Sequence, residues 1–266
     1  MFKQAWAVVL LGVAATNALV VIPPRIVIVP SDTTLNRGAS SFSPSSSVNL
    51  TVLEDIAGGG RNGYLAVISG ASSVFEALPP INECGNGLFK TLETASKAGC
   101  KLATNGGPFG MKGKGKSIMI SLSTDLVSFE LRTLLSQDFT GSNAQFGVSR
   151  NNEWVMGHVN STDELSELGV MNIMSGFGWL VYNGTSTVST PGGEAAPRTT
   201  IGVDGKGRLL MLVVDGCETC KSGKGPTLYQ MAINELKRMI GLEYCCWQDI
   251  LISIGAAHAI NLDGGG

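Results

Sequence analysis

Clusters of basic residues are scarce in this chain of 266 residues. Only 15% of the residues are charged, the formal net charge is −2, and no group of lysines is denser than Lys112, Lys114 and Lys116. A protein whose main partner is a nucleic acid carries an extended basic patch. The sequence therefore argues against nucleic acid as a partner. The three lysines are interpreted as a solvated loop, with attraction of a phosphate substrate as the alternative.

Long apolar runs are equally scarce, because the main one, residues 5–15, is too short to span a bilayer comfortably. It follows Lys3 and precedes small residues, which is typical of a signal peptide over residues 1–18; an uncleaved anchor is the alternative. No second membrane segment is visible. Three Asn-X-Ser/Thr sequons agree with the secretory pathway as the expected location. They begin at Asn49, Asn160 and Asn183.

Histidine is rare as well, with only two in the chain, and this limits the metal chemistry available to the six cysteines. Cys217 and Cys220 have the spacing of a zinc or redox half-site, but a structural zinc needs four ligands and no second such pair is present. We therefore expect no metal and no cofactor. In a secreted chain these cysteines are expected to form a disulfide with each other or with Cys245 or Cys246.

The organisation along the chain indicates one large domain behind a polar segment. Residues 31–47 are rich in Ser, Pro and Gly, so residues 19–49 are interpreted as a flexible linker or a processed pro-segment. The packed domain is expected over residues 50–266. Helical and strand patterns are mixed without regular alternation, which predicts an α/β mixed (α+β) domain with a mixed sheet and flanking helices.

Local patterns predict particular elements of this domain. Two hairpins are expected because turn residues separate paired apolar runs, and glycines in the second turn can take positive φ. A helix with one apolar face is expected near the C-terminus. The predicted elements are strands at 64–69 and 102–104, a helix at 91–98, hairpins at 144–148/154–159 and 199–203/208–214, and a helix at 228–240.

Three segments each place a polar side chain against small backbone at the end of an apolar stretch. They are residues 103–109 (ATNGGPF), 196–202 (APRTTIG) and 259–266 (AINLDGGG). Backbone without a Cβ leaves space and exposed N–H groups for an anionic or sugar ligand. An Asp-Gly pair alone is also a common turn signal, so each segment by itself is weak.

Together with residues 143–148 and 175–184, and in the same order, these segments resemble the signatures of the phosphodiester glycosidase family. The resemblance covers about residue 50 to the end. It implies hydrolysis of a sugar-1-phosphodiester, commonly removal of N-acetylglucosamine from phosphomannose on glycoproteins to expose mannose 6-phosphate. The implied partner is a phosphoglycan or glycoprotein substrate, in the Golgi lumen or outside the cell. A disulfide between Cys84 and Cys100 is implied as well.

The sequence also departs from the family at its end. The family continues beyond the glycine triplet with a Ser and further strands, so the domain is expected to be truncated at its C-terminus. Residues 241–257 look like an insertion between the last helix and the last strand.

The resemblance and the residues together suggest a catalytic set. Asp263 is the first candidate and Asp215 the second for a carboxylate beside the anomeric carbon, where positive charge develops. For Asp215 a turn-capping role is the alternative. Asn105 is expected to bond sugar hydroxyls or the acetamido group.

The substrate-binding set is expected around the phosphate. Arg198 offers a planar guanidinium fork to two phosphate oxygens, with a structural salt bridge as the alternative, and Thr199 adjoins it. Glycine backbone is expected to approach the substrate at Gly106, Gly107, Gly264 and Gly265.

Two other functions are compatible with the same residues. One is hydrolysis of a different glycosyl phosphodiester, such as one in a surface polysaccharide. The other is a non-catalytic secreted protein that binds a sugar phosphate. A general phosphodiesterase would differ by releasing a sugar phosphate instead of free sugar.

Overall fold

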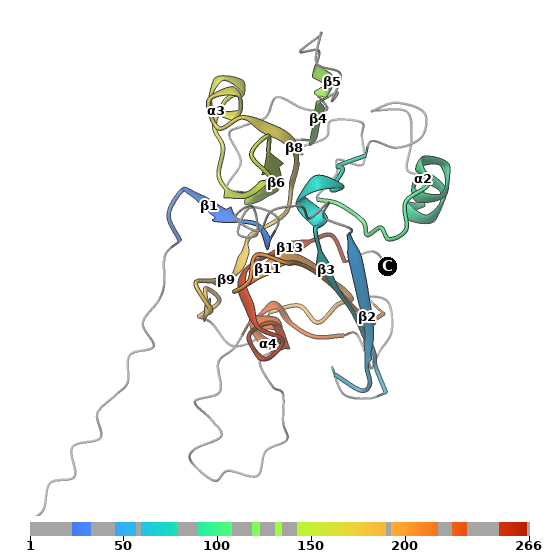
Figure 1. The fold of residues 1–266 in the computed structure, drawn as a ribbon. Helices are drawn as coiled ribbons and strands as arrows, with labels where there is room; N and C mark the ends of the chain where they lie inside the picture. The colour runs from blue at the N-terminus through green and yellow to red at the C-terminus, as the bar shows by residue number, and fades with distance from the viewer. Residues whose placement is uncertain are drawn as a thin grey trace, which may run out of the picture.

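Two β-sheets packed against each other make up most of the structure (Figure 1). The computed structural model describes residues 23–32, 46–56, 60–78, 90–107, 119–122, 131–134, 143–189, 193–217, 225–232 and 250–264. Every strand pairing within these residues is antiparallel. The α+β class is confirmed. In place of the one expected sheet there are two, one with six strands and one with seven.

The six-stranded sheet is built around the first predicted hairpin, which is confirmed. Its turn contains Asn152 at φ 58°, a left-handed conformation that asparagine tolerates better than most residues. The strand order is β1 (Ile26–Pro30), β7 (Glu153–Gly157), β6 (Gln145–Ser149), β8 (Val170–Ser175), β4 (Met119–Leu122) and β5 (Leu131–Leu134).

The seven-stranded sheet contains the second predicted hairpin, also confirmed. Asp204 accepts bonds from the backbone N–H groups of Lys206 and Arg208, both at 2.9 Å, and Gly207 has φ 76°, so the turn is fixed by its own residues. The strand order is β10 (Thr185–Ser186), β9 (Trp179–Tyr182), β13 (Ala256–Leu262), β11 (Arg198–Asp204), β12 (Leu209–Val214), β3 (Gly63–Ser69) and β2 (Ser47–Leu53).

The main core lies between the two sheets. Phe146 and Trp154 from the six-stranded sheet pack with Ile201 and Ile260 from the seven-stranded sheet. All four side chains are fully buried. Phe75 places its ring edge-on against both aromatic rings, at centroid distances of 5.6 and 5.8 Å. This core fixes the two sheets relative to each other, because alternate residues of each strand point into it.

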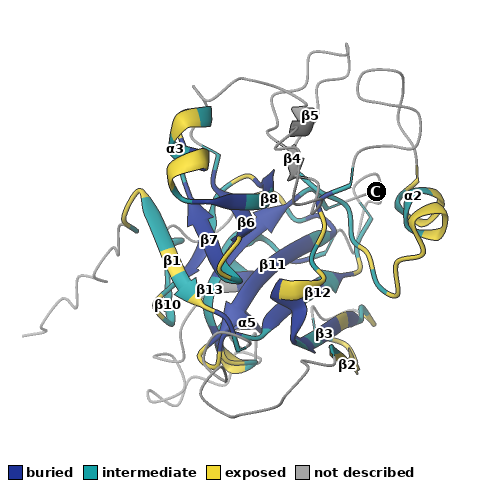
Figure 2. Ribbon diagram, turned by 45° about the horizontal axis from the view of Figure 1, so that its top comes forward, coloured by how far each residue is buried: buried dark blue, intermediate teal, exposed yellow. Residues whose placement is uncertain are grey.

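Helices cover the outer faces of the sheets (Figure 2). On the seven-stranded sheet, Met231 of α4 (Leu228–Ala232) and Leu251 of α5 (Ile250–Ser253) pack on Leu212. On the six-stranded sheet, Leu165 of α3 (Thr162–Glu167) packs near Ile173. The central strands of each sheet are thereby buried, whereas β2, at one edge of the seven-stranded sheet, is exposed.

The predicted helix at 91–98 is confirmed as α2 (Thr91–Ala98), which ends at Gly99 with φ 70°. Helix α4 is the beginning of the predicted helix at 228–240, whose remainder lies outside the described residues. So do the predicted signal peptide and most of the insertion. The strand expected at 102–104 is wrong: these residues form an irregular segment. No helix within the described ranges is long and apolar enough to cross a membrane.

The N-terminal segment expected to be a linker or pro-segment contributes structure to the domain. Strand β1 pairs with β7 along its whole length, and β2 starts at Ser47, ahead of the expected domain boundary at residue 50. Ser31 is fully buried and accepts a bond from the hydroxyl of Ser72 at 2.9 Å. A flexible linker is therefore the wrong description of residues 26–32. Proteolytic processing stays a prediction.

Candidate active site

The candidate site lies at one edge of the seven-stranded sheet, where the register brings three predicted residues together. Arg198 opens β11 and pairs with Val214, the last residue of β12, so that Asp215 follows at the same edge. On the other side of β11, Leu262 pairs with Thr199 and Asp263 follows. Asp263 and Asp215 thus follow the two strands that flank β11, and the backbones of these strands lie about 5 Å from β11 across the sheet.

A segment from the other end of the sequence closes over this edge. The side-chain amide of Asn105 donates to the backbone carbonyl of Asp263, and the backbone N–H of Asp263 donates to the carbonyl of Gly106 at 2.9 Å. The Asn105 Oδ1 accepts bonds from Thr199 at 3.1 Å and from Thr104 at 3.2 Å. These bonds join the three segments that resemble the family signatures, residues 103–109, 196–202 and 259–266.

Thr199 supports the site from beneath. Its side chain is fully buried, and its hydroxyl bonds to Asn105. A direct contact with substrate, expected from the sequence, is not open to a buried side chain. The backbone carbonyl of Asp263 can only accept, so it faces the nitrogen of the Asn105 amide, and the Thr199 hydroxyl donates to the oxygen at the other end.

The glycines of the site divide into two kinds. A Cβ on Gly107 would lie 1.7 Å from the carbonyl oxygen of Ser175, and one on Gly264 would lie 2.1 Å from that of Pro197. These two glycines are required for close backbone packing. A Cβ on Gly106 would meet nothing nearer than the Met174 sulfur at 4.0 Å, so space is open there. Gly265 lies outside the described residues.

The Arg198 side chain leaves β11 on the side opposite Thr199, since neighbouring residues of a strand point to opposite faces. Its guanidinium donates to the carbonyl of Pro226 at 3.2 Å and to that of Glu194. Two loops therefore fix the orientation of the group. Both of these acceptors are uncharged carbonyls, and the guanidinium that they hold is half-buried at the sheet edge.

Asp215 is exposed, and its backbone is tied to Asn62 by an N–H···O bond of 2.9 Å. The hydroxyl of Tyr64 donates to its carboxylate at 3.4 Å. Tyr64 was not predicted as a site residue. It lies 151 residues away in sequence and reaches Asp215 only because β3 pairs with β12.

This arrangement of polar residues coincides with the family match. The phosphodiester glycosidase model matches residues 98–266, more than half of the chain. The chain belongs to this family. Human N-acetylglucosamine-1-phosphodiester alpha-N-acetylglucosaminidase is 32% identical over 192 residues, covering 65% of this chain and 32% of the human protein. The mouse enzyme of the same name is 28% identical over 225 residues, covering 77% of this chain and 38% of its own.

A solved structure agrees with the fold of this phosphodiester glycosidase. It is the zebrafish N-acetylglucosamine-1-phosphodiester alpha-N-acetylglucosaminidase catalytic domain auto-inhibited by its pro-peptide, with a TM-score of 0.62 and 21% identity. The match covers 91% of this chain and 76% of the zebrafish chain. The chain spans only about a third of the length of the human and mouse relatives.

Cysteine chemistry in this phosphodiester glycosidase differs from one predicted pair to the other. Cys217 is disulfide-bonded, as expected, and its partner lies outside the described residues. Cys100 is a free, exposed thiol, which does not support its bridge to Cys84. Cys84 lies outside the described residues, so that pairing stays a prediction. Within the described part of the chain, His, Cys, Asp and Glu form no group of three that could hold a metal.

Proposed function

We propose that this phosphodiester glycosidase releases free N-acetylglucosamine from an N-acetylglucosamine 1-phosphodiester. In the substrate we favour, the phosphate is esterified to mannose on a glycoprotein, so that cleavage exposes mannose 6-phosphate. The names of the human, mouse and zebrafish relatives support the sugar. The observation that carries the proposal is the register that places Asp263 and Asp215 on either side of Arg198.

The bond that breaks joins the anomeric carbon to the bridging oxygen of the phosphodiester. Water supplies hydroxyl to that carbon and a proton to the medium, and the phosphate leaves as a monoester on the mannose. The phosphate oxygens are weakly basic, so departure requires little protonation. Arg198 stabilises the charge that grows on these oxygens, and its orientation is already set by Pro226 and Glu194.

Asp263 acts on the sugar side. Positive charge develops at the anomeric carbon, and a carboxylate beside it lowers the energy of the transition state as nucleophile, base or electrostatic partner. The backbone of Asp263 is held on both sides, since its N–H bonds to Gly106 and its carbonyl to Asn105. A fixed backbone limits the positions open to the carboxylate, so less entropy is lost when it reaches the transition state. Asn105, which lies next to Gly106 in the chain, contacts the sugar as well.

Passage through the secretory pathway is part of the proposal. The acceptor asparagines of all three sequons, Asn49, Asn160 and Asn183, are exposed in the structure. Exposure is what glycosylation requires. An enzyme that acts on glycoproteins would meet its substrate in that compartment.

The deciding experiment follows sugar release by the full chain made in a secretory host. The substrate is the phosphodiester of N-acetylglucosamine and methyl mannoside. Free N-acetylglucosamine is expected, and Asp263→Asn should lower kcat/KM by about 10² to 10⁴-fold. Asp163→Asn, on the exposed surface of α3, is the matched control and should leave kcat/KM unchanged.

Three other results would overturn the proposal. Release of a sugar phosphate would identify a general phosphodiesterase. Binding without any release, by well-folded protein, would identify a sugar-phosphate-binding protein. Release from a polysaccharide phosphodiester alone would assign a different substrate to the same site.

A further inference from the structure

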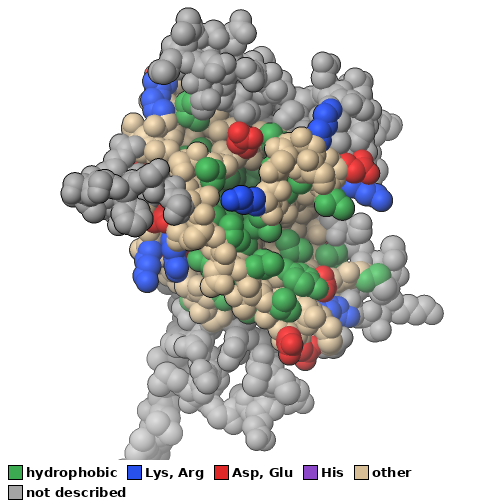
Figure 3. Space-filling view, turned by 45° about the vertical axis from the view of Figure 1, so that its right-hand side comes forward, with side chains coloured by type: hydrophobic (Ala, Val, Ile, Leu, Met, Phe, Trp, Pro, Cys, Tyr) green, Lys and Arg blue, Asp and Glu red, His purple; other side chains and the backbone are tan. Residues whose placement is uncertain are grey.

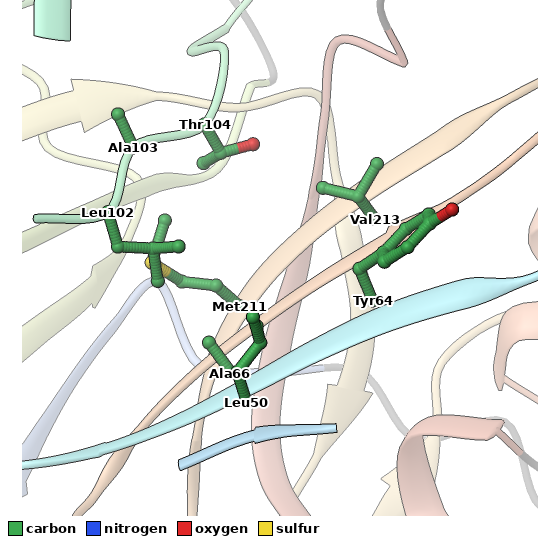
Figure 4. Close-up of a pocket in the computed structure, with 8 residues that line it drawn as sticks. All are labelled: Leu50, Tyr64, Ala66, Leu102, Ala103, Thr104, Met211 and Val213. Atoms are coloured by element: carbon green, nitrogen blue, oxygen red, sulfur yellow. The ribbon is translucent and has the colours of Figure 1, made fainter. Parts of the chain in front are cut away.

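An apolar pocket of about 310 Å³ lies directly beside the candidate site (Figure 4). One side is the segment containing Leu102 and Thr104, and the other is formed by strands β2, β3 and β12. Side chains on the strands include Leu50, Tyr64, Ala66, Met211 and Val213. The lining residues carry no charge. Leu50 is 60% and Tyr64 41% exposed, so the pocket opens to solvent.

The pocket is continuous with the site along one row of the sheet. Thr199 pairs with Val213, and Val213 pairs with Tyr64. Cross-strand partners share a face and lie about 5 Å apart. The pocket wall at Val213 therefore begins one strand away from the threonine that holds Asn105, and Asp215 reaches its rim through the hydroxyl of Tyr64.

The position of Arg198 indicates which part of a substrate would enter. Its guanidinium turns toward Pro226 and Glu194, on the face opposite Thr199 and the pocket. Asn105, where the sugar is proposed to bind, is bonded to Thr199 on the pocket face, whereas a phosphate at Arg198 would lie toward the other face. The group that enters the pocket must then belong to the sugar.

The chemistry of the lining selects one substituent of that sugar. Figure 3 shows hydrophobic side chains gathered on one face of the molecule, with a Lys or Arg side chain lying among them. Hydroxyl groups lose hydrogen bonds to water in such a site, whereas an acyl chain gains from burial. The volume is at the lower end of those that hold small organic ligands, and one methyl group would leave most of it empty.

We propose that this pocket receives the N-acyl group of the sugar and that the enzyme accepts acyl chains longer than acetyl. This inference rests on the proposed function, because it assumes a glucosamine 1-phosphodiester in the site. Each additional methylene that enters an apolar pocket should raise kcat/KM about fourfold.

The test uses the full chain and glucosamine 1-phosphodiesters of methyl mannoside that differ only in the N-acyl group. Release of the sugar is compared for acetyl, propanoyl and butanoyl substrates. A rise of about fourfold per methylene is expected. Turnover of the acetyl compound with flat or falling values for the longer chains would overturn the inference.

Calorimetric binding of the three N-acylglucosamine 1-phosphates separates this inference from the proposed function. If no phosphodiester is cleaved, affinity that rises with acyl length still supports the pocket while the proposed function fails. Affinity that does not change with acyl length rejects the pocket assignment as well.

Two exposed leucines provide a matched pair of variants. Leu50→Asp introduces a charge at the pocket rim, and the preference for butanoyl over acetyl should fall from about 16-fold to near one. Leu92→Asp, on α2 and 74% exposed, should retain the preference. Val213→Phe places a larger side chain in the pocket and should also abolish the preference for butanoyl. Full preference in a folded Leu50→Asp or Val213→Phe protein would contradict the inference.

Discussion

Asn105 donates its side-chain amide to the backbone carbonyl of Asp263, a residue 158 positions further along the chain. The reciprocal bond runs from the N–H of Asp263 to Gly106. Two signature segments are thereby joined at the edge of the sheet, and the third contributes Thr199 to the same amide. The geometry of the site depends on these few bonds.

Asn105→Asp should damage both stability and activity. The aspartate places an oxygen where the amide nitrogen donates, so two acceptors face each other at the carbonyl of Asp263. We expect a loss of about 1–3 kcal/mol in the free energy of unfolding and a fall in kcat/KM on the order of 100-fold. Urea unfolding and sugar release measure the two effects. Asn49→Asp, exposed on β2, is the control, and an equal loss there would contradict the argument.

Gly107→Ala and Gly106→Ala should differ sharply although the positions are adjacent. The alanine Cβ at residue 107 would lie 1.7 Å from the Ser175 oxygen, so the backbone must shift, at a cost of about 1–3 kcal/mol. At residue 106 the nearest atom is 4.0 Å away, and stability should change little. Urea unfolding of both variants tests the difference. Similar destabilisation by both would show that close packing does not explain these glycines.

Thr199→Val should lower the stability of the protein, whereas Thr200→Val should not. Thr199 loses its bond to Asn105, which should cost about 1 kcal/mol. The hydroxyl of Thr200 is buried and has no hydrogen-bond partner among the described residues. Replacing it by a methyl group should be neutral or raise stability by up to about 1 kcal/mol. A drop for Thr200→Val in thermal or urea unfolding would reveal an unseen partner for that hydroxyl.

The sequence predicts elements whose causes are local. Asn151 and Asn152 turn one hairpin, Asp204 and Gly207 turn the other, and both were placed correctly because the turn residues carry their own backbone preferences. The grouping of Arg198 with the carboxylates was accessible only through the family resemblance.

Features that depend on the pairing of strands far apart in the chain cannot be read from a comparable signal in the sequence. The hydrogen bond from Tyr64 to Asp215 exists because β3 pairs with β12. The segment at 102–104 has strand-like composition, yet its apolar residue Leu102 packs on the core from an irregular segment. Strand β1 is a run of β-branched residues that favours a strand, but its place beside β7 is set by pairing with a distant part of the chain.

Arg198→Ala should impair phosphodiester cleavage much more than cleavage of a substrate without phosphate. The guanidinium acts on charge that grows on phosphate oxygens, so kcat/KM should fall on the order of 10³-fold for the phosphodiester. For an aryl N-acetylglucosaminide the fall should be less than about tenfold, because no phosphate charge develops. Arg198→Lys retains charge but loses the planar fork and should recover only part of the activity. Equal losses on both substrates would assign Arg198 to the support of the loops at Glu194 and Pro226.

His258 should make the stability of the protein fall as the pH drops below neutrality. Burial lowers the pKa of His258 below its ordinary value of 6.5, and the ring packs against Tyr182 and Trp179 while its Nδ1 accepts a weak bond from Asn183 at 3.4 Å. The unfolded chain therefore takes up a proton at a higher pH than the folded one. Stability is fully present above about pH 6.5 and is lost as the pH falls through the folded pKa. Urea unfolding between about pH 7.5 and 5.5 should show this loss, and His258→Gln should show a flatter profile. The same slope in both proteins would mean that another group is responsible.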